Sequence, residues 1–170
     1  MIYKVTKKQN NSEMCFVCGM SNHSGLHTFF YELEGKKLLG IFKGHDIHQS
    51  YPQRMHGGII SALLDETIGR ALQIDDDLVF GVTIEMNIKY LKPVPLDQEL
   101  RAVGWITSNR SRIFQGEGYI CNTENEILAT CEAKYMKQPV LTIVNGEDFI
   151  EEQWIYVVDE ESPISFELPK

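Results

Sequence analysis

The sequence predicts an α+β domain in which an antiparallel β-sheet wraps around one long helix. Two observations lead to this prediction. Residues 57–74 have helical periodicity and contain no proline, and six shorter apolar stretches, separated by turn-forming residues, have the length and composition of strands. Two strands, a long helix and then four strands with short connections pack most simply as an antiparallel sheet over a single helix.

Two of the strands precede the helix, at residues 28–33 and 36–42. Glu34 and Gly35 between them suit a hairpin turn, since short loops join antiparallel strands most readily. Residues 43–56 follow the second strand, contain a glycine and a proline, and are expected to be irregular. The first half of the sheet is therefore expected to be one short hairpin.

The helix is predicted at residues 57–74, where most residues are good helix formers. Apolar residues recur every four positions along it, so they would lie on one face of the kind that a sheet covers. The residues of this face are Ile60, Leu64, Ile68 and Leu72, with Leu63 and Ala71 beside them.

Four strands are expected after the helix. Apolar and polar side chains alternate along residues 82–90, which is the period of a strand with one buried face, and Pro93 ends this strand. The other three strands are joined by short polar turns and lie at residues 98–107, 112–121 and 126–137. A sheet covered by one helix keeps an exposed edge, so pairing of copies in a homodimer or homotetramer is expected.

We divide the chain into three parts. Residues 1–27 form a lead-in with a Cys-x-x-Cys motif, residues 28–138 form the main domain, and residues 139–170 form an extension of unknown role. Within the lead-in, residues 1–14 are expected to be loose and polar, and residues 15–27 are expected to be an ordered loop.

Composition and charge argue against several classes of protein. The 170 residues are 43% hydrophobic and 24% charged, which is typical of one globular domain. The net charge is −8 without a basic stripe, so nucleic acid is not an expected partner. No apolar run approaches the roughly 20 residues that span a bilayer. The first residues also lack the apolar core of a signal peptide, so a membrane is not an expected partner and the cytoplasm is the expected location.

The start and the middle of the helix carry the residues that predict chemistry. Gly57 and Gly58 leave the first N–H groups of the helix uncovered, and such a terminus stabilises an oxygen that becomes negative during attack on a carbonyl. Asp65 lies seven residues after Gly58, close to two full turns, so both project on nearly the same side, together with Ser61 and Gly69. An aspartate within an apolar helix is costly to bury without a function.

Simpler interpretations exist for each of these residues. The two glycines could form a turn, and Asp65 could face water. Glu66 precedes Arg70 by four residues, which is the favourable order for an ion pair on the surface of a helix. From spacing alone, a functional and a structural role for Asp65 are about equally supported.

Three segments resemble the hotdog-fold thioesterases of the 4-hydroxybenzoyl-CoA thioesterase superfamily, in particular the phenylacetate-pathway-like branch. The segment HGGIISALLDE resembles the signature of their central helix, a His-Gly-Gly followed by a catalytic Asp nine residues after the His. The segment GVTIEMNIKYLKPV resembles the next strand. CFVCGMSNHSGLH resembles an N-terminal module often attached to such domains, with His23 in place of its usual proline. The resemblance covers residues 15–137.

The resemblance implies hydrolysis of acyl-coenzyme A thioesters at a subunit interface, with no cofactor and no metal. Asp65 would act as the general base on water or as the nucleophile, and Thr83 would position the water. Gly58 of a second subunit, with Gly57, would bind the carbonyl oxygen through the backbone N–H. His56 would shape that turn or contact the thioester.

Further residues are candidates for substrate binding. Many relatives place an Asn or Gln before the His-Gly-Gly segment to hold the thioester carbonyl, and the candidates here are Gln49, Ser50 and Gln53. Arg110 and Arg112 lie in a predicted hairpin, where they would contact the phosphates of coenzyme A or remain on the surface. No single residue indicates the acyl group.

The four cysteines are expected to be reduced thiols. Cys121 and Cys131 lie in strand-like runs and are expected to be buried as small hydrophobic residues. The other two belong to a group with partial zinc-ligand spacing: Cys15, Cys18, His23 and His27. The central gap is short for a zinc finger, so an ordered loop without metal is the favoured interpretation. A redox role for the Cys-x-x-Cys motif has less support again, because no strand–motif–helix context surrounds it.

Other functions fit parts of the same sequence. A non-catalytic acyl-CoA sensor on the same fold would have no need for a buried Asp65. A zinc-stabilised interaction module would use the N-terminal cysteines and histidines, and a hydratase would need a separate Asp/His pair. His45 and His48 lie in a polar loop and are expected to be solvated rather than to bind metal.

Overall fold

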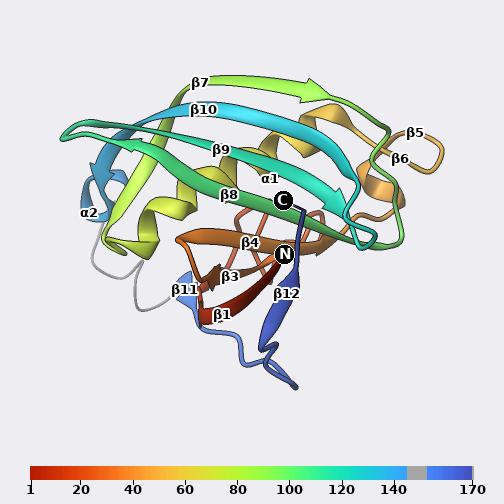
Figure 1. The fold of residues 1–170 in the computed structure, drawn as a ribbon, viewed down its shortest axis with the longest axis horizontal. Coiled ribbons are helices and arrows are strands. Elements are labelled where there is room, and N and C mark those ends of the chain that lie inside the picture. Colours follow the sequence, from red (N-terminus) through yellow and green to blue (C-terminus); the bar gives the residue numbers. More distant parts are fainter. Residues whose placement is uncertain (145–152, 170) are drawn as a thin grey trace.

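The computed structural model describes residues 1–144 and 153–169. Its main element is an eight-stranded antiparallel sheet that curves around the helix α1 (Gly57–Arg70) (Figure 1). The predicted fold class is therefore confirmed. The strands follow the order β12, β1, β3, β4, β8, β9, β10, β7 across the sheet. Their bounds are β1 Ile2–Lys8, β3 Phe29–Leu33, β4 Lys37–Lys43, β7 Val79–Tyr90, β8 Glu99–Asn109, β9 Ile113–Asn122, β10 Ile127–Pro139 and β12 Ser165–Glu167.

Several short elements complete the fold. Two small pairs of strands lie outside the main sheet: β2 (Asn11–Ser12) with β11 (Trp154–Ile155), and β5 (Gln49–Tyr51) with β6 (Arg54–Met55). Among the described residues, the short helices are η1 (Asp46–His48), η2 (Ala71–Ile74) and α2 (Val140–Ile143). No helix in the described ranges is both long enough and apolar enough to cross a bilayer.

All six strands and the helix predicted from local patterns are present. β3 and β4 form the expected hairpin, and its turn contains Gly35 and Lys36, whose φ angles are 77° and 58°. α1 ends at Arg70, and the last residues of the predicted helix form the tighter turn η2. The predicted apolar face of α1 is at most 4% exposed at each of its positions and packs against the strands that curve around it.

The N-terminal segment is part of the main sheet, so the expectation of a loose lead-in at residues 1–14 is wrong. β1 pairs with β3 on one side and with β12 on the other. β12 comes from the C-terminal extension, whose Leu168 is 1% exposed in an apolar cluster on the opposite face of the sheet from α1. The sheet thus extends beyond residues 28–138 on both sides.

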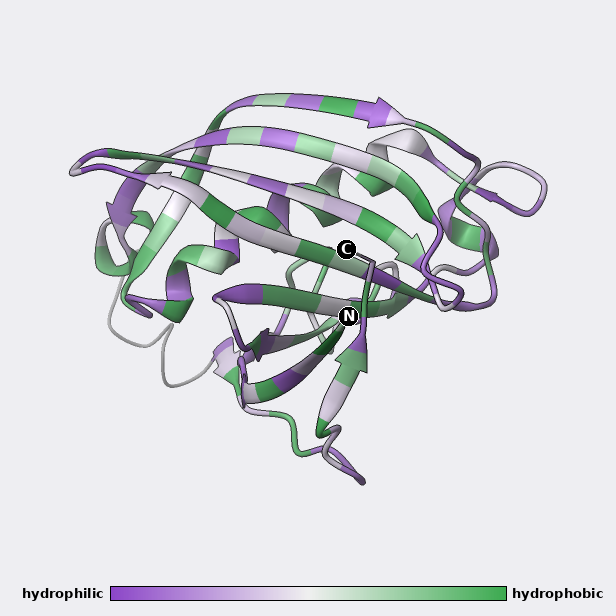
Figure 2. Ribbon diagram, viewed as in Figure 1, coloured by the Kyte–Doolittle hydropathy of each residue, from purple (hydrophilic) through white to green (hydrophobic). Residues whose placement is uncertain are grey.

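β7 forms one edge of the main sheet. Within the described residues it pairs only with β10. Apolar and polar residues alternate along it (Figure 2), and several of its apolar side chains are exposed. These are Val82 at 40%, Ile84 at 54% and Tyr90 at 53%. A long edge with exposed apolar side chains is a surface on which another strand can pair.

Candidate active site

The N-terminus of α1 is capped by His56. Its ring Nδ1 accepts a hydrogen bond of 2.9 Å from the Gly58 N–H, and its carbonyl accepts from the N–H groups of Ile59 and Ile60. The Gly58 N–H, which the sequence predicts as an oxyanion donor, is therefore engaged by His56 in the single chain. His56 is exposed, so rotation of its ring would release this N–H.

Tyr90, at the end of β7, joins this terminus to the sheet. Its hydroxyl donates to the Gly57 carbonyl at 3.1 Å and lies 2.9 Å from the Ser61 hydroxyl. Ser61 Oγ also donates to the Gly57 carbonyl, at 2.9 Å. The contact fixes the start of α1 against the edge strand. Sequence reasoning missed Tyr90, because its role depends on how the strand lies against the helix.

Asp65 lies halfway along α1 and is partly buried. Thr83, on β7, donates a hydrogen bond of 2.7 Å from its hydroxyl to Asp65 Oδ1. Burial raises the pKa of the Asp65 carboxyl above its ordinary value, and the bond from Thr83 acts in the opposite direction. The structure thus brings these two predicted residues together, with Thr83 orienting the carboxylate.

Tyr135, on β10, holds the helix backbone behind the carboxylate. Its hydroxyl donates to the Asp65 carbonyl at 3.1 Å, and its ring stacks on Phe114 with centroids 4.7 Å apart. Tyr135 is 1% exposed, so this position is rigidly packed. Sequence reasoning missed it too, although its place in an apolar strand gave a signal for burial.

A cavity of about 350 Å³ opens beside Asp65. α1 contributes Asp65 and Gly69, and β7 contributes Thr83. The N-terminal segment contributes Cys15 to the lining, and β11 contributes Trp154. The carboxylate therefore lies in a concave site with mixed apolar and polar walls, which is the usual setting of a reacting group.

The glycine terminus and the carboxylate of one chain are well separated. Gly58 and Asp65 lie seven positions apart on α1. At a rise of about 1.5 Å per residue, this corresponds to about 10 Å along the helix axis. One carbonyl group cannot contact both, so a site that uses both needs a glycine terminus from elsewhere.

The predicted substrate-binding residues fall into two groups. Gln49, Ser50 and Gln53 lie in the β5–β6 hairpin that leads into α1, and Arg110 and Arg112 lie in the turn between β8 and β9. All five side chains are exposed. The two groups lie at opposite ends of the sheet (Figure 1), so one chain does not bring them together.

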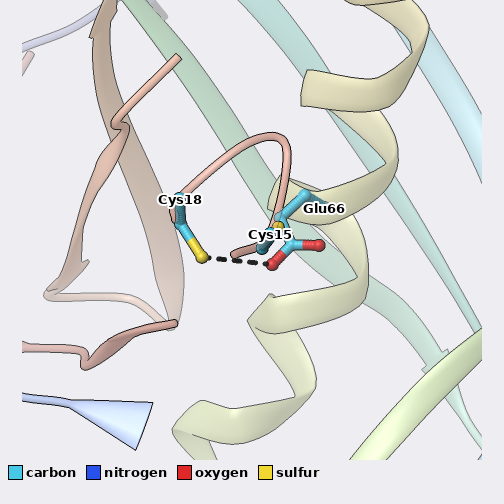
Figure 3. A group of neighbouring side chains, drawn as sticks. All are labelled: Cys15, Cys18 and Glu66. Atoms are coloured by element: carbon cyan, nitrogen blue, oxygen red, sulfur yellow. Dashed lines mark hydrogen bonds between the residues drawn. The ribbon is translucent and has the colours of Figure 1, made fainter. Parts of the chain in front are cut away.

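The N-terminal cysteines lie beside α1. The side-chain ligand atoms of Cys15, Cys18 and Glu66 lie within 4.8 Å of one another (Figure 3). In the described part of the chain, this is the one group of three or more such residues with the spacing of metal ligands. It does not include His23 or His27, and His27 Nε2 is instead 2.8 Å from the Asn22 carbonyl.

Arg70 is fully buried next to this cluster. Its guanidinium donates to Glu66 Oε1 at 2.7 Å and to Cys18 Sγ at 3.2 Å, and it lies between the rings of Phe30 and Trp154. The predicted pair between Glu66 and Arg70 is present, but its assignment to the surface is wrong because the Arg70 side chain is only 3% exposed.

His45 and His48 were both expected to be solvated, and of the two only His45 is. His45 is exposed, whereas His48 is 1% exposed. His48 Nδ1 accepts from the His45 N–H, and Nε2 lies 3.0 Å from the Ser24 carbonyl. His48 thus satisfies loop carbonyl and amide groups in the interior, and the expectation that it is solvated is wrong. Cys121 and Cys131 are buried, as predicted.

Residues 53–129, which contain α1, Asp65 and Thr83, match the family model described as the Thioesterase superfamily. The chain is 33% identical over 70 residues to acyl-coenzyme A thioesterase THEM4 of Mus musculus. This match covers 41% of the chain and 29% of the mouse protein, so the chain corresponds to less than a third of that relative's length.

Solved structures share the architecture. A thioesterase superfamily protein, RHA08564, is 23% identical with a TM-score of 0.67, over 72% of this chain and 59% of its own. BH2602 of Bacillus halodurans, solved with CoA, is 26% identical with a TM-score of 0.54, over 58% and 70%. Escherichia coli PaaI, from the phenylacetic acid degradation operon, is 16% identical with a TM-score of 0.59, over 66% and 80%. The domain therefore has the hotdog fold, and its residues 53–129 are similar to the thioesterase superfamily.

Proposed function

We propose that this protein hydrolyses acyl-CoA thioesters and that Asp65 is its catalytic carboxylate. The observation that supports this most directly is the position of Asp65, partly buried in a cavity of about 350 Å³ on the central helix of a thioesterase-superfamily domain. THEM4 is named as an acyl-coenzyme A thioesterase, and BH2602 was solved with CoA, which supports this substrate class.

Asp65 would supply either a base or a nucleophile. As a base, its carboxylate would take a proton from water as the water attacks the thioester carbonyl. As a nucleophile, it would attack that carbonyl itself and form an anhydride, which water would then hydrolyse. In both routes the hydroxyl of Thr83, 2.7 Å from Oδ1, would hold the carboxylate in one orientation. Burial also raises its pKa and makes it a stronger base than an exposed aspartate.

The oxyanion would be stabilised by a second copy of the chain. Gly57 and Gly58 lie about 10–12 Å along α1 from Asp65 of the same chain, so the donors would come from the partner's helix terminus. Pairing of the β7 edges of two copies would place two such helices side by side under one continuous sheet. The His56 ring would turn away from the Gly58 N–H as the thioester carbonyl takes its place.

The substrate would then extend away from this interface. Gln49, Ser50 and Gln53 precede the helix terminus of one copy, where they would contact the thioester or the adjacent pantetheine arm. Arg110 and Arg112, at the other end of the sheet, would meet the phosphates of coenzyme A from the second copy. A homodimer is the smallest assembly that supplies both groups, and a homotetramer would contain two such pairs.

Thiol release from a panel of thioesters tests the proposal. Wild type and Asp65→Asn would be compared on acetyl-, hexanoyl-, lauroyl-, phenylacetyl- and benzoyl-CoA. Loss of a general base typically lowers the rate by about 10²–10⁴-fold, so we expect the variant to lose activity by that factor on every substrate that wild type hydrolyses. Asp77→Asn is the matched control, because Asp77 is exposed and outside the Asp65 cavity.

Two outcomes would contradict the proposal. Full turnover by a folded Asp65→Asn variant would assign the base to another group, with Glu66 next to be replaced. Binding of acyl-CoA by wild type without thiol release from any substrate would favour an acyl-CoA sensor on the same fold.

A further inference from the structure

Cys15 and Cys18 lie in one tight turn at the end of the N-terminal segment. The Gly19 N–H donates to the Cys15 carbonyl at 2.8 Å, and a Cβ atom at position 19 would lie only 2.3 Å from that carbonyl oxygen. Residue 19 therefore has to be glycine for this turn to close. Residues three apart in a helical turn have Cβ atoms about 5–6 Å apart, and here the two Sγ atoms lie within 4.8 Å. A small rotation of the two side chains would bring the sulfurs into bonding distance.

Cys18 is set in surroundings that stabilise a sulfur anion. The thiol is 0% exposed, and its Sγ accepts a hydrogen bond of 3.2 Å from the buried guanidinium of Arg70. The Ser12 N–H donates to the same atom at 3.5 Å. Arg70 cannot turn away, because it is held between Phe30 and Trp154 and by Glu66.

The two thiols shift each other's pKa in opposite directions. A hydrogen bond from the Cys15 thiol and the charge of Arg70 lower the pKa of Cys18 to about 6, although burial acts against this shift. The same hydrogen bond, with burial and the nearby Glu66, raises the pKa of Cys15. Cys18 is therefore the more acidic thiol of the pair, and its sulfur can take a proton from Cys15.

Access differs between these two sulfurs. Cys15 is partly exposed and lines the cavity that contains Asp65, whereas Cys18 lies behind it. In Figure 3 the Cys18 sulfur faces the Glu66 carboxylate on α1, to which its thiol donates at 3.9 Å. A small molecule in the cavity would therefore meet Cys15 first, with Cys18 placed to react with it next.

Arg70 favours a metal-free dithiol over a metal site. The guanidinium already supplies a buried positive charge to both Cys18 and Glu66, two of the three potential ligands. A zinc ion would be added beside this fixed charge and would find only three protein ligands among the described residues, where structural zinc takes four.

We propose that Cys15 and Cys18 form a thiol–disulfide exchange site that opens into the Asp65 cavity and takes small disulfides as co-reactant. Cys15 attacks one sulfur of the disulfide RSSR and passes its proton to Cys18, which gives the mixed disulfide Cys15–S–S–R and releases RS⁻. Cys18 then attacks the Cys15 sulfur, and its proton leaves with the second R group as RSH. The protein loses two electrons in forming the Cys15–Cys18 bond, and RSSR gains them.

Oxidation by glutathione disulfide tests this site without any need for thioesterase activity. The reduced protein is incubated with glutathione disulfide, quenched in acid, alkylated and analysed by peptide mass spectrometry. We expect two of the four thiols to be lost, as one disulfide between Cys15 and Cys18, and to be recovered on adding reduced glutathione. Cys121 and Cys131 are internal controls: they are buried on separate strands, where burial raises the pKa of each to about 11, and they should remain alkylatable.

Two serine variants separate the roles of the two thiols. Cys18→Ser should stop at a stable mixed disulfide between Cys15 and glutathione, because no second thiol resolves it. Cys15→Ser should leave Cys18 unmodified, because the attacking thiol is gone; circular dichroism of both variants checks that they are folded. A wild-type protein that forms no Cys15–Cys18 bond would overturn the proposal. The proposal would also be overturned if one equivalent of zinc blocked alkylation of both thiols until a chelator removed the metal.

Discussion

At the scale of single residues, Asp65 shows how far spacing can predict a site. Its position on one stripe of the helix with Gly58 follows from the helical period, and the contact with Thr83 was reached through resemblance to a family. Its partner Tyr135 and the wall residue Trp154 are brought to it by pairings between distant parts of the chain, which no local pattern reports. The burial of Arg70 was missed for the same reason, because Cys18, Phe30 and Trp154, which enclose it, lie on other segments.

The raised pKa of Asp65 predicts how the stability of the fold depends on pH. A carboxyl whose pKa is higher in the folded than in the unfolded state favours folding while it is protonated, and this contribution is lost as pH rises through the folded pKa. Asp65→Asn removes the ionisation and keeps an acceptor for Thr83. We therefore expect the variant to gain stability relative to wild type as pH rises from about 4, near the ordinary aspartate value, to about 8.

Urea unfolding of both proteins at each pH measures this difference. Asp77→Asn, at an exposed position, should show no such gain. A variant that instead becomes less stable than wild type as pH rises would mean that the carboxylate form of Asp65 is stabilised by the fold.

At the scale of elements, periodicity located α1 and six strands, because each has a face that must be buried and its sequence repeats with the period of that face. β1 and β12 were not predicted. They are held by pairing with each other and with β3, and Leu168 joins a cluster whose other members are far away in sequence. A short strand stabilised mainly by distant partners carries little local signal.

Tyr90 is expected to connect β7 to the start of α1. Tyr90→Phe removes the hydroxyl that contacts the Gly57 carbonyl and Ser61. A neutral hydrogen bond contributes about 0.5–1.5 kcal/mol, and the exposure of Tyr90 places the expected loss in the free energy of unfolding near the lower end. Tyr51→Phe, at a position that is 73% exposed, is the control, and denaturant unfolding measures both. An equal effect of the two substitutions would show that the Tyr90 contact contributes nothing.

At the scale of the whole molecule, the β7 edge of one chain has no second partner strand within the described residues. The β7 edge, its exposed apolar side chains and the separation of Gly58 from Asp65 are all consistent with a second copy docking there. The sequence predicted pairing of copies from the general need to cover an edge, and the family resemblance implied a site at the subunit interface.

A charge on the β7 edge should separate the copies. Ile84→Lys places an ammonium group where the proposed partner strand would pack, so we expect a shift to monomer and a loss of thiol release together. Ile164→Lys, at a position that is 81% exposed and distant in the sheet from β7, should change neither. Sedimentation velocity and the thioester assay measure the two effects. A monomeric Ile84→Lys variant with full activity would show that one chain suffices.

The placement of Trp154 gives the molecule an optical reporter. The chain has two tryptophans, and they lie in different surroundings: Trp154 borders the Asp65 cavity and stacks on Arg70, while Trp105 packs beside Tyr119 on the opposite face of the sheet. Trp105→Phe would leave Trp154 as the one tryptophan, whose emission senses what enters the cavity. A ligand titration followed by its intensity should then show occupancy directly, with unlabelled protein and without turnover.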